Sequence, residues 1–420
     1  MQYLVYLSSI LIFYIFLKIK KSVISSFSLV MLPYVVILFF NNFFFKNYNF
    51  IEIDENTCFM LLIGIISFSF GALIISLTIN NQKKSDYFFK SCLTNYQLDA
   101  ISNYVLIVIV LRIAELFLLI CKYGILGLLA DDFKLLVTRG VIGHLLISIF
   151  PLIPILFYHY LQYHKRKYLF LCILFLILAF IETEKAQSIS IVLATFLYCV
   201  FINKRYLKGG VFFIFFMIVF LFIGNYMTKF LLGGFFKDVD NSYYITRLWT
   251  YIAGGLINSN LITSSIGIQV SGFDYFEHVL FAFPNMFLGA LANTQLGVQV
   301  STYMPYIADF PYVTTVHDGF SAQTSNVIST MTFIYSNGNL LAFIPVCIFW
   351  GGICEYIMEK MRYCKNEFNL TFACCFMSFT MLSFFASYYS SASFVERLLY
   401  CLLFPIVLHT PIKRYIVKSY

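Results

Sequence analysis

Two polar stretches of this sequence combine residue types that could bind an anion and move a proton. The first is Asp240–Asn260, where Asn241 or Ser242 could cap the start of a helix. Five of its residues fall at i, i+4, i+7, i+8 and i+11, which places them on one helix face: Arg247, Tyr251, Gly254, Gly255 and Asn258. A guanidinium, a phenol and two positions without side chains predict a donor-lined surface for a bulky anion, because arginine recognises phosphate oxygens as a fork.

A Gly-Gly pair is also typical of close helix packing. In the alternative interpretation, Gly254 and Gly255 form a notch for a neighbouring element and Arg247 extends towards the membrane interface. The sequence leaves both interpretations open.

The second stretch, Tyr312–Asn326, contains His317 beside Asp318. Histidine titrates near neutral pH, so this pair could act as a general base with a neighbouring carboxylate. The alternative is a turn built on Asp318-Gly319 that carries a solvated histidine.

Four charged residues fall inside apolar runs, where charges are costly and count as functional candidates. Arg112 and Glu115 are three residues apart, so they can pair on one helix face. Glu396 and Arg397 are adjacent, so their side chains point apart and are expected to pair with other elements. Structural and functional roles are equally open for both pairs.

The elements that must position these residues follow from the composition. The 420 residues are 60% hydrophobic and only 11% charged, whereas a soluble domain needs roughly 25% charged residues on its surface. The sequence therefore predicts an all-α, polytopic membrane protein. It excludes a soluble enzyme, a secreted disulfide scaffold and a nucleic-acid-binding protein, despite a formal charge of +8.

A helix needs about 20 apolar residues to cross the hydrocarbon layer, and interfacial residues can complete shorter runs. The sequence contains eleven such candidates: Tyr3–Leu17, Phe27–Phe45, Cys58–Ile79, Asn103–Cys121, His144–Tyr163, Tyr168–Ile181, Ser188–Ile202, Val211–Thr228, Leu340–Ile357, Leu370–Tyr389 and Phe394–His409.

The basic residues predict the side of the membrane on which each loop lies. Every second loop and the C-terminal tail carry three basic residues each, which together make 18 of the 28 lysines and arginines. The positive-inside rule places them in the cytoplasm. An odd number of spans then puts the N-terminus in the periplasm and the C-terminus in the cytoplasm.

The largest outer segment is Lys229–Asn337, a quarter of the chain. Loops of this length are usually functional or disordered, and its aromatic and aliphatic runs argue against disorder. Its His278–Ala292 piece is too short to span the membrane and predicts an interfacial or re-entrant helix. We expect one integral-membrane domain over residues 1–420, with residues 229–337 as its periplasmic loop.

Three segments resemble the O-antigen and capsule polymerases, which join lipid-linked oligosaccharide repeat units. They are KYGILGLLADDFKLLVTRG in the Lys122–Gly143 loop, RLWTYIAGG at Arg247–Gly255, and TSNVIST with YSNGNLLAFIPVCIFWGG within Thr324–Gly352. The likeness covers most of the chain as architecture and about 60 residues as motif.

The resemblance implies a glycosyltransferase of the bacterial inner membrane that acts on polyprenyl-pyrophosphate-linked oligosaccharides at the outer face. Arg139 and Arg247, with Tyr251, Gly254 and Gly255, would bind the pyrophosphate. His317, or an acid among Asp318, Asp274 and Glu277, would take the acceptor proton. No cofactor or metal is implied. The partners would be lipid-linked substrates, membrane lipid, a chain-length regulator and a flippase, with no nucleic acid.

Two other functions stay open. An O-antigen ligase shares the large outer loop but transfers finished polymer to lipid A core. A lipid-linked-oligosaccharide flippase or other transporter would be expected to show internal repeats and short loops on both sides. The long outer segment and the absence of a visible repeat favour the polymerase.

Overall fold

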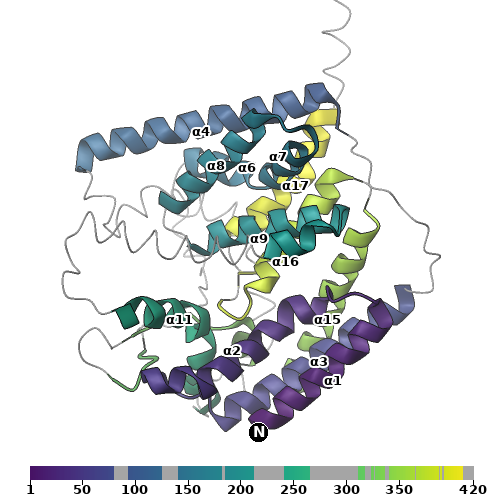
Figure 1. Cartoon of the computed structure of the whole chain (residues 1–420), viewed down its shortest axis with the longest axis vertical. Coiled ribbons are helices and arrows are strands. Elements are labelled where there is room, and N and C mark those ends of the chain that lie inside the picture. Colours follow the sequence, from purple (N-terminus) through teal and green to yellow (C-terminus); the bar gives the residue numbers. More distant parts are fainter. Residues whose placement is uncertain are drawn as a thin grey trace, which may run out of the picture. The chain divides into compact units, whose positions relative to one another are not determined.

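The computed structural model describes residues 1–79, 93–124, 141–181, 185–211, 241–264, 311–316, 323–325, 327–335, 340–364, 366–386, 388–389 and 392–409. Across these ranges the chain is predominantly helical, and its only β pairings are two isolated bridges (Figure 1). Five helices in the described residues are long and apolar enough to cross a membrane. These findings confirm the all-α membrane class, and the count of eleven spans stays a prediction.

Helices occupy ten of the eleven predicted spans. In chain order they are α1 (Gln2–Lys20), η1 (Phe27–Met31) with α2 (Leu32–Phe43), α3 (Glu55–Ile79), α4 (Asn95–Tyr123), α6 (Val141–Ile149) with α7 (Leu152–Tyr163), α8 (Arg166–Ile181), α9 (Lys185–Ile202), α15 (Leu340–Arg362), α16 (Glu367–Met381) and α17 (Ala392–His409). The eleventh, Val211–Thr228, lies outside the described residues beyond Val211. Four further helices lie in the described ranges: η2 (Phe45–Tyr48), α11 (Asn241–Ile257), α12 (Ser259–Ser264) and α14 (Thr330–Tyr335).

Two predicted spans differ from the structure. The run His144–Tyr163 is interrupted between α6 and α7 at Pro151, because proline lacks the N–H that a continuous helix needs. The run Leu370–Tyr389 ends as a helix at Met381 and continues as turns. One of its freed carbonyls, that of Ser383, accepts a hydrogen bond from the Thr330 amide at 2.8 Å, so this backbone is satisfied outside the helix.

The chain forms two compact units, each assembled from distant segments. The first unit comprises residues 1–86, 238–360 and 379–395, and the second comprises residues 87–237, 361–378 and 396–420. The sequence pattern does not separate them, because both units consist of apolar helices.

Two glycines bring α3 and α15 together in the first unit. A methyl group added at Gly71 would lie 1.9 Å from the Ile348 carbonyl oxygen, and one added at Gly351 would lie 1.9 Å from that of Phe68. The two backbones are therefore in direct contact, as small residues allow in membrane helices.

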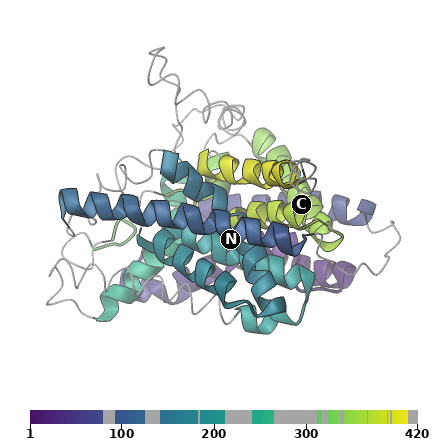
Figure 2. The same ribbon diagram turned by 90° about the horizontal axis from the view of Figure 1, so that it is seen from above.

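The second unit contains α4, α6, α7, α8 and α9, with most of α16 and α17. α4 is an unbroken helix of 29 residues, visible as the long blue ribbon in Figures 1 and 2. Thr94 and Gln97 form a capping box that fixes its start.

Helix ends that the charge pattern assigns to one side do meet within each unit. In the first unit, Trp249 donates to Asn41 at 3.0 Å among the predicted outer ends, whereas Lys20 meets Glu355 among the predicted inner ends. In the second unit, Gln97 donates to the Leu408 carbonyl at 3.4 Å, again between two predicted inner ends. The contacts support the relative direction of these helices, and which side is the cytoplasm stays a prediction.

Candidate functional site

Arg247 projects from α11 towards a chain segment that is distant in sequence. Its Nη1 donates a hydrogen bond of 2.8 Å to Oε1 of Gln323. The Gln323 side chain is buried, and its backbone amide donates to Oγ1 of Thr314 at 2.9 Å. Arg247 as a whole is partly exposed, and its guanidinium is oriented by this buried partner.

The predicted helix face is present, but most of it packs against the protein itself. A methyl group at Gly254 would lie 2.5 Å from Ser325 Oγ, and one at Gly255 would lie 2.3 Å from the Phe385 carbonyl oxygen. Asn258 donates to the carbonyls of Ser325 and Val327 at 2.8 and 2.9 Å. The packing interpretation accounts for both glycines, which leaves Arg247 and Tyr251 as the anion-binding candidates on this face.

Tyr251 lies one helical turn beyond Arg247 and is also partly exposed. Its ring stacks on Phe385, with centroids 6.2 Å apart and planes inclined by 21°. The contact with Phe385 fixes the orientation of the ring, and Tyr251 shares its helix face with Arg247.

Three short segments pair beside α11; we call residues 49–51, 311–316 and 323–325 the outer platform. Phe50 bridges Thr314, and Tyr312 bridges Thr324, both in antiparallel fashion. The Val313 amide donates to the Gln323 carbonyl at 2.9 Å, and the Ile51 amide donates to the Val313 carbonyl at 3.0 Å. The second bridge therefore pairs segments 311–316 and 323–325.

His317 and Asp318 lie outside the described residues. Arg139, Asp274 and Glu277 also lie outside the described residues.

Trp249 of α11 is a structural anchor. Its side chain is buried, and its indole stacks on Phe45 with centroids 4.0 Å apart and planes inclined by 3°. Its Nε1 donates to Asn41, whose own amide donates to the Ile51 carbonyl at 2.9 Å. The tryptophan thus ties α11 to α2 and to the outer platform, whereas Tyr312 on the platform is exposed.

The predicted pairing of intramembrane charges is confirmed in the second unit. Arg112 forms an ion pair with Glu115 on the same face of α4. Arg397 is fully buried; its Nη1 donates to Ser190 Oγ at 2.8 Å, and its guanidinium lies 3.6 Å from the centre of the Phe150 ring. Its neighbour Glu396 instead contacts His144, so the two adjacent side chains do serve different elements.

The contact between His144 and Glu396 was not predicted. His144 Nδ1 lies 2.9 and 3.0 Å from the two carboxylate oxygens of Glu396. The available signal was that both residues begin predicted spans at the same membrane side. Pairing these two helices required knowledge of which of the eleven spans are neighbours.

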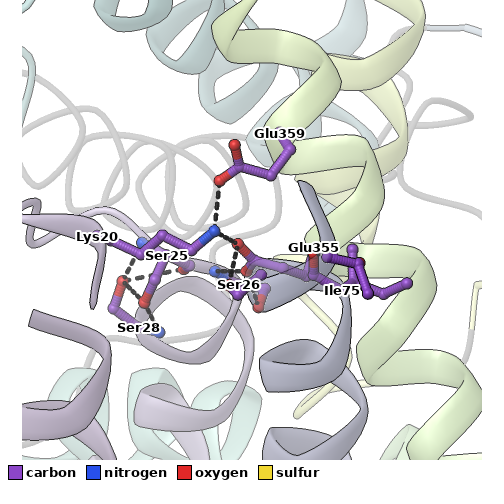
Figure 3. A network of polar contacts seen from close by, with 9 residues as sticks. Lys20, Ser25, Ser26, Ser28, Ile75, Glu355 and Glu359 are labelled. Carbon is purple, nitrogen blue, oxygen red and sulfur yellow. Dashed lines mark hydrogen bonds and ion pairs between the residues drawn. The ribbon is translucent and has the colours of Figure 1, made fainter. Parts of the chain in front are cut away.

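A buried ion cluster joins the end of α1 to α15 in the first unit (Figure 3). It lies among the predicted inner ends of the helices, whereas Arg247 lies near the predicted outer ends. Lys20 Nζ lies 2.7 Å from Glu355 and 2.5 Å from Glu359. Glu355 also accepts hydrogen bonds from the hydroxyls of Ser26 at 2.6 Å and Ser76 at 3.2 Å. The sequence pattern counted Lys20 among the cytoplasmic surface charges, but its side chain is only 3% exposed and belongs to the core.

Nothing in the described part of the chain assembles a metal site. No group of three histidine, cysteine, aspartate or glutamate side chains converges there. Of the ten cysteines described, eight are buried, as expected for packing residues.

Comparison with protein-family models, curated proteins and solved structures finds no match for this chain.

Proposed function

We propose that the protein is a membrane glycosyltransferase that polymerises polyprenyl-pyrophosphate-linked repeat units into O-antigen or capsular polysaccharide. The observation that carries this proposal is the position of Arg247. Its guanidinium is oriented by Gln323, which follows His317 and Asp318 in the sequence. An anion-binding group and proton-accepting residue types thus belong to connected parts of one unit.

The proposed reaction requires charge stabilisation and proton removal. The acceptor hydroxyl oxygen bonds to the anomeric carbon of the donor while the bond from that carbon to the diphosphate oxygen breaks. The electron pair of the broken bond leaves with the diphosphate, and the hydroxyl proton passes to a base. Arg247 and Arg139 would stabilise the departing diphosphate, and preorganised donors of this kind typically contribute about 3 to 4 kcal/mol each.

The rest of the proposal follows the charge pattern and the resemblance. The enzyme would lie in the bacterial inner membrane, with its outer platform on the periplasmic side. Its substrates would arrive already activated through a flippase, and a chain-length regulator would act with it. No cofactor or metal is required by this chemistry.

Surface glycans of a strain that lacks the gene test the proposal. A polymerase deletion should leave single repeat units on the lipid core, and the intact gene should restore long chains. Bare core in the deletion strain would instead indicate the ligase or the flippase.

The same strain tests the role of Arg247. Arg247→Ala should reduce long chains by about 100-fold or more, because one donor to the leaving group is lost. Arg205→Ala is the matched control, since Arg205 is exposed and lies in a predicted cytoplasmic loop. Equal chain lengths for both variants would refute the assignment of Arg247.

A further inference from the structure

Exposed lysines gather at the predicted inner end of the first unit. Lys18 lies in the last turn of α1, Lys21 follows that helix, and Lys360 lies near the end of α15; all three residues are exposed. The buried ion cluster holds the two helices together at this point, because Lys20 of α1 binds two carboxylates of α15 (Figure 3). The exposed lysines of both helices therefore belong to the same end of the unit.

The acidic side chains of the cluster do not cover these lysines. Glu355 and Glu359 are buried and contact Lys20, whose side chain is buried as well. Their negative charge is therefore directed into the protein, and an anion that approaches this end meets the exposed lysines first.

Two of the exposed lysines lie over tyrosine rings. Lys18 Nζ is 4.7 Å from the centre of the Tyr14 ring, and Lys360 Nζ is 5.2 Å from the centre of the Tyr356 ring. Both tyrosines are exposed and precede their lysine by one helical turn. Tyrosines concentrate where the hydrocarbon of a bilayer meets the headgroups, so the two ammonium groups lie at the level of lipid phosphates.

Each of these pairs also ends an exposed apolar helix face. Exposed residues recur every three or four positions along one face of α1: Tyr3, Leu7, Ile10, Tyr14 and Lys18. A corresponding face of α15 contains Leu341, Phe349, Tyr356 and Lys360. A soluble anion would contact only the lysines. A phospholipid fits both parts, because its acyl chains can lie along the apolar face while its phosphate reaches the ammonium groups.

We propose that the predicted inner end of the first unit binds the headgroups of anionic phospholipids through Lys18 and Lys360. Each ammonium group donates a hydrogen bond to a phosphate oxygen, and Lys21 adds to the local positive charge. The acyl chains pack along the exposed faces of α1 and α15. This lipid site uses neither Arg247 nor the outer platform, so it is independent of the proposed function.

Native mass spectrometry of the purified protein can measure this binding. Phosphatidylglycerol and phosphatidylcholine with the same acyl chains would be added in a non-ionic detergent, and the wild type should retain the anionic lipid preferentially. Lys18→Gln and Lys360→Gln should each lower the affinity for phosphatidylglycerol by about 5-fold, and the double variant by about 25-fold, the usual effect of lysines near an anionic membrane surface. Lys18→Arg should bind as the wild type does, because its charge is kept.

A lysine of the same unit provides the matched control. Lys46 is exposed but forms an ion pair with Glu52, so Lys46→Gln should retain phosphatidylglycerol as the wild type does. Because Lys18 and Lys360 are exposed, their glutamine variants should unfold at the wild-type temperature when no lipid is added. This second measurement separates a loss of binding from a loss of folding.

Several results would overturn the lipid site. Equal retention of the two lipids by the wild type would show that charge does not select the lipid. An unchanged affinity of the double variant, or an equal loss for Lys46→Gln, would show that Lys18 and Lys360 do not form the site. Displacement of the lipid by millimolar inorganic phosphate would show that these lysines bind a free anion instead. None of these measurements depends on polymerisation, so they test the lipid site separately from the proposed function.

Discussion

Lys20 Nζ lies 2.7 Å from Glu355, and both side chains are almost completely buried, at 3% and 0% exposure. Lys20 is the last residue of α1, and Glu355 lies in the second half of α15. More than 300 residues separate them in the sequence. Their contact holds helix ends together in the interior of the first unit (Figure 3).

Removal of the lysine should therefore destabilise the first unit. Lys20→Met would leave Glu355 and Glu359 buried without the shared cation. Breaking a buried ion pair typically costs about 3 to 5 kcal/mol, so thermal unfolding in detergent should begin at a clearly lower temperature. Lys18→Met is the control, because Lys18 is exposed and lies over Tyr14. Equal unfolding temperatures for the two variants would contradict the prediction.

The contact between α3 and α15 can be tested at adjacent glycines. Gly351→Ala places a methyl group 1.9 Å from the Phe68 carbonyl oxygen, so the helices must separate. Overpacking of this kind usually costs about 1 to 3 kcal/mol. The nearest atom to a methyl group at Gly352 is 3.6 Å away, so Gly352→Ala should be nearly neutral. Urea or thermal unfolding of the purified variants would show the difference, and the reverse order would refute the packing.

The hydrogen bond between Arg247 and Gln323 predicts an activity change that does not depend on folding. Gln323→Glu converts the neutral partner into a carboxylate, which should hold the guanidinium more strongly and compete with a diphosphate. We expect shorter surface polysaccharide with unchanged or higher thermal stability. Thr315→Glu is the charge-matched control on the exposed side of the outer platform. Full-length chains from Gln323→Glu would argue against anion binding by Arg247.

Membrane sidedness is open to chemical labelling. With exposed Cys121 replaced by serine, Tyr312→Cys should react with a membrane-impermeant maleimide in intact spheroplasts. Lys360→Cys, at the predicted cytoplasmic end of α15, should react only after the membrane is permeabilised. Labelling of Lys360→Cys in intact spheroplasts would invert the orientation.

The sequence alone determined the membrane class of this protein and the approximate bounds of its helices. Charge scarcity and apolar runs depend only on composition and on the thickness of a bilayer, so they can be read without knowing which helices touch. The helix Asn241–Ile257 was also predictable, because the spacing that defines its face is a local feature, although Asn241 and Ser242, the predicted caps, lie inside it.

Tertiary structure decided what those helices do with their polar residues. The spacing of Gly254 and Gly255 is the same for an anion site and for a packing notch, and only the nearby Ser325 and Phe385 favour packing. The charge pattern predicts that Lys20 is a cytoplasmic surface charge, whereas the structure pairs it with two buried carboxylates of α15, Glu355 and Glu359. His144 and Glu396 likewise form a pair only because α6 and α17 are neighbours. Such contacts join residues that are hundreds of positions apart. The local sequence of one apolar helix does not indicate which other helix it packs against, because the apolar helices have similar patterns.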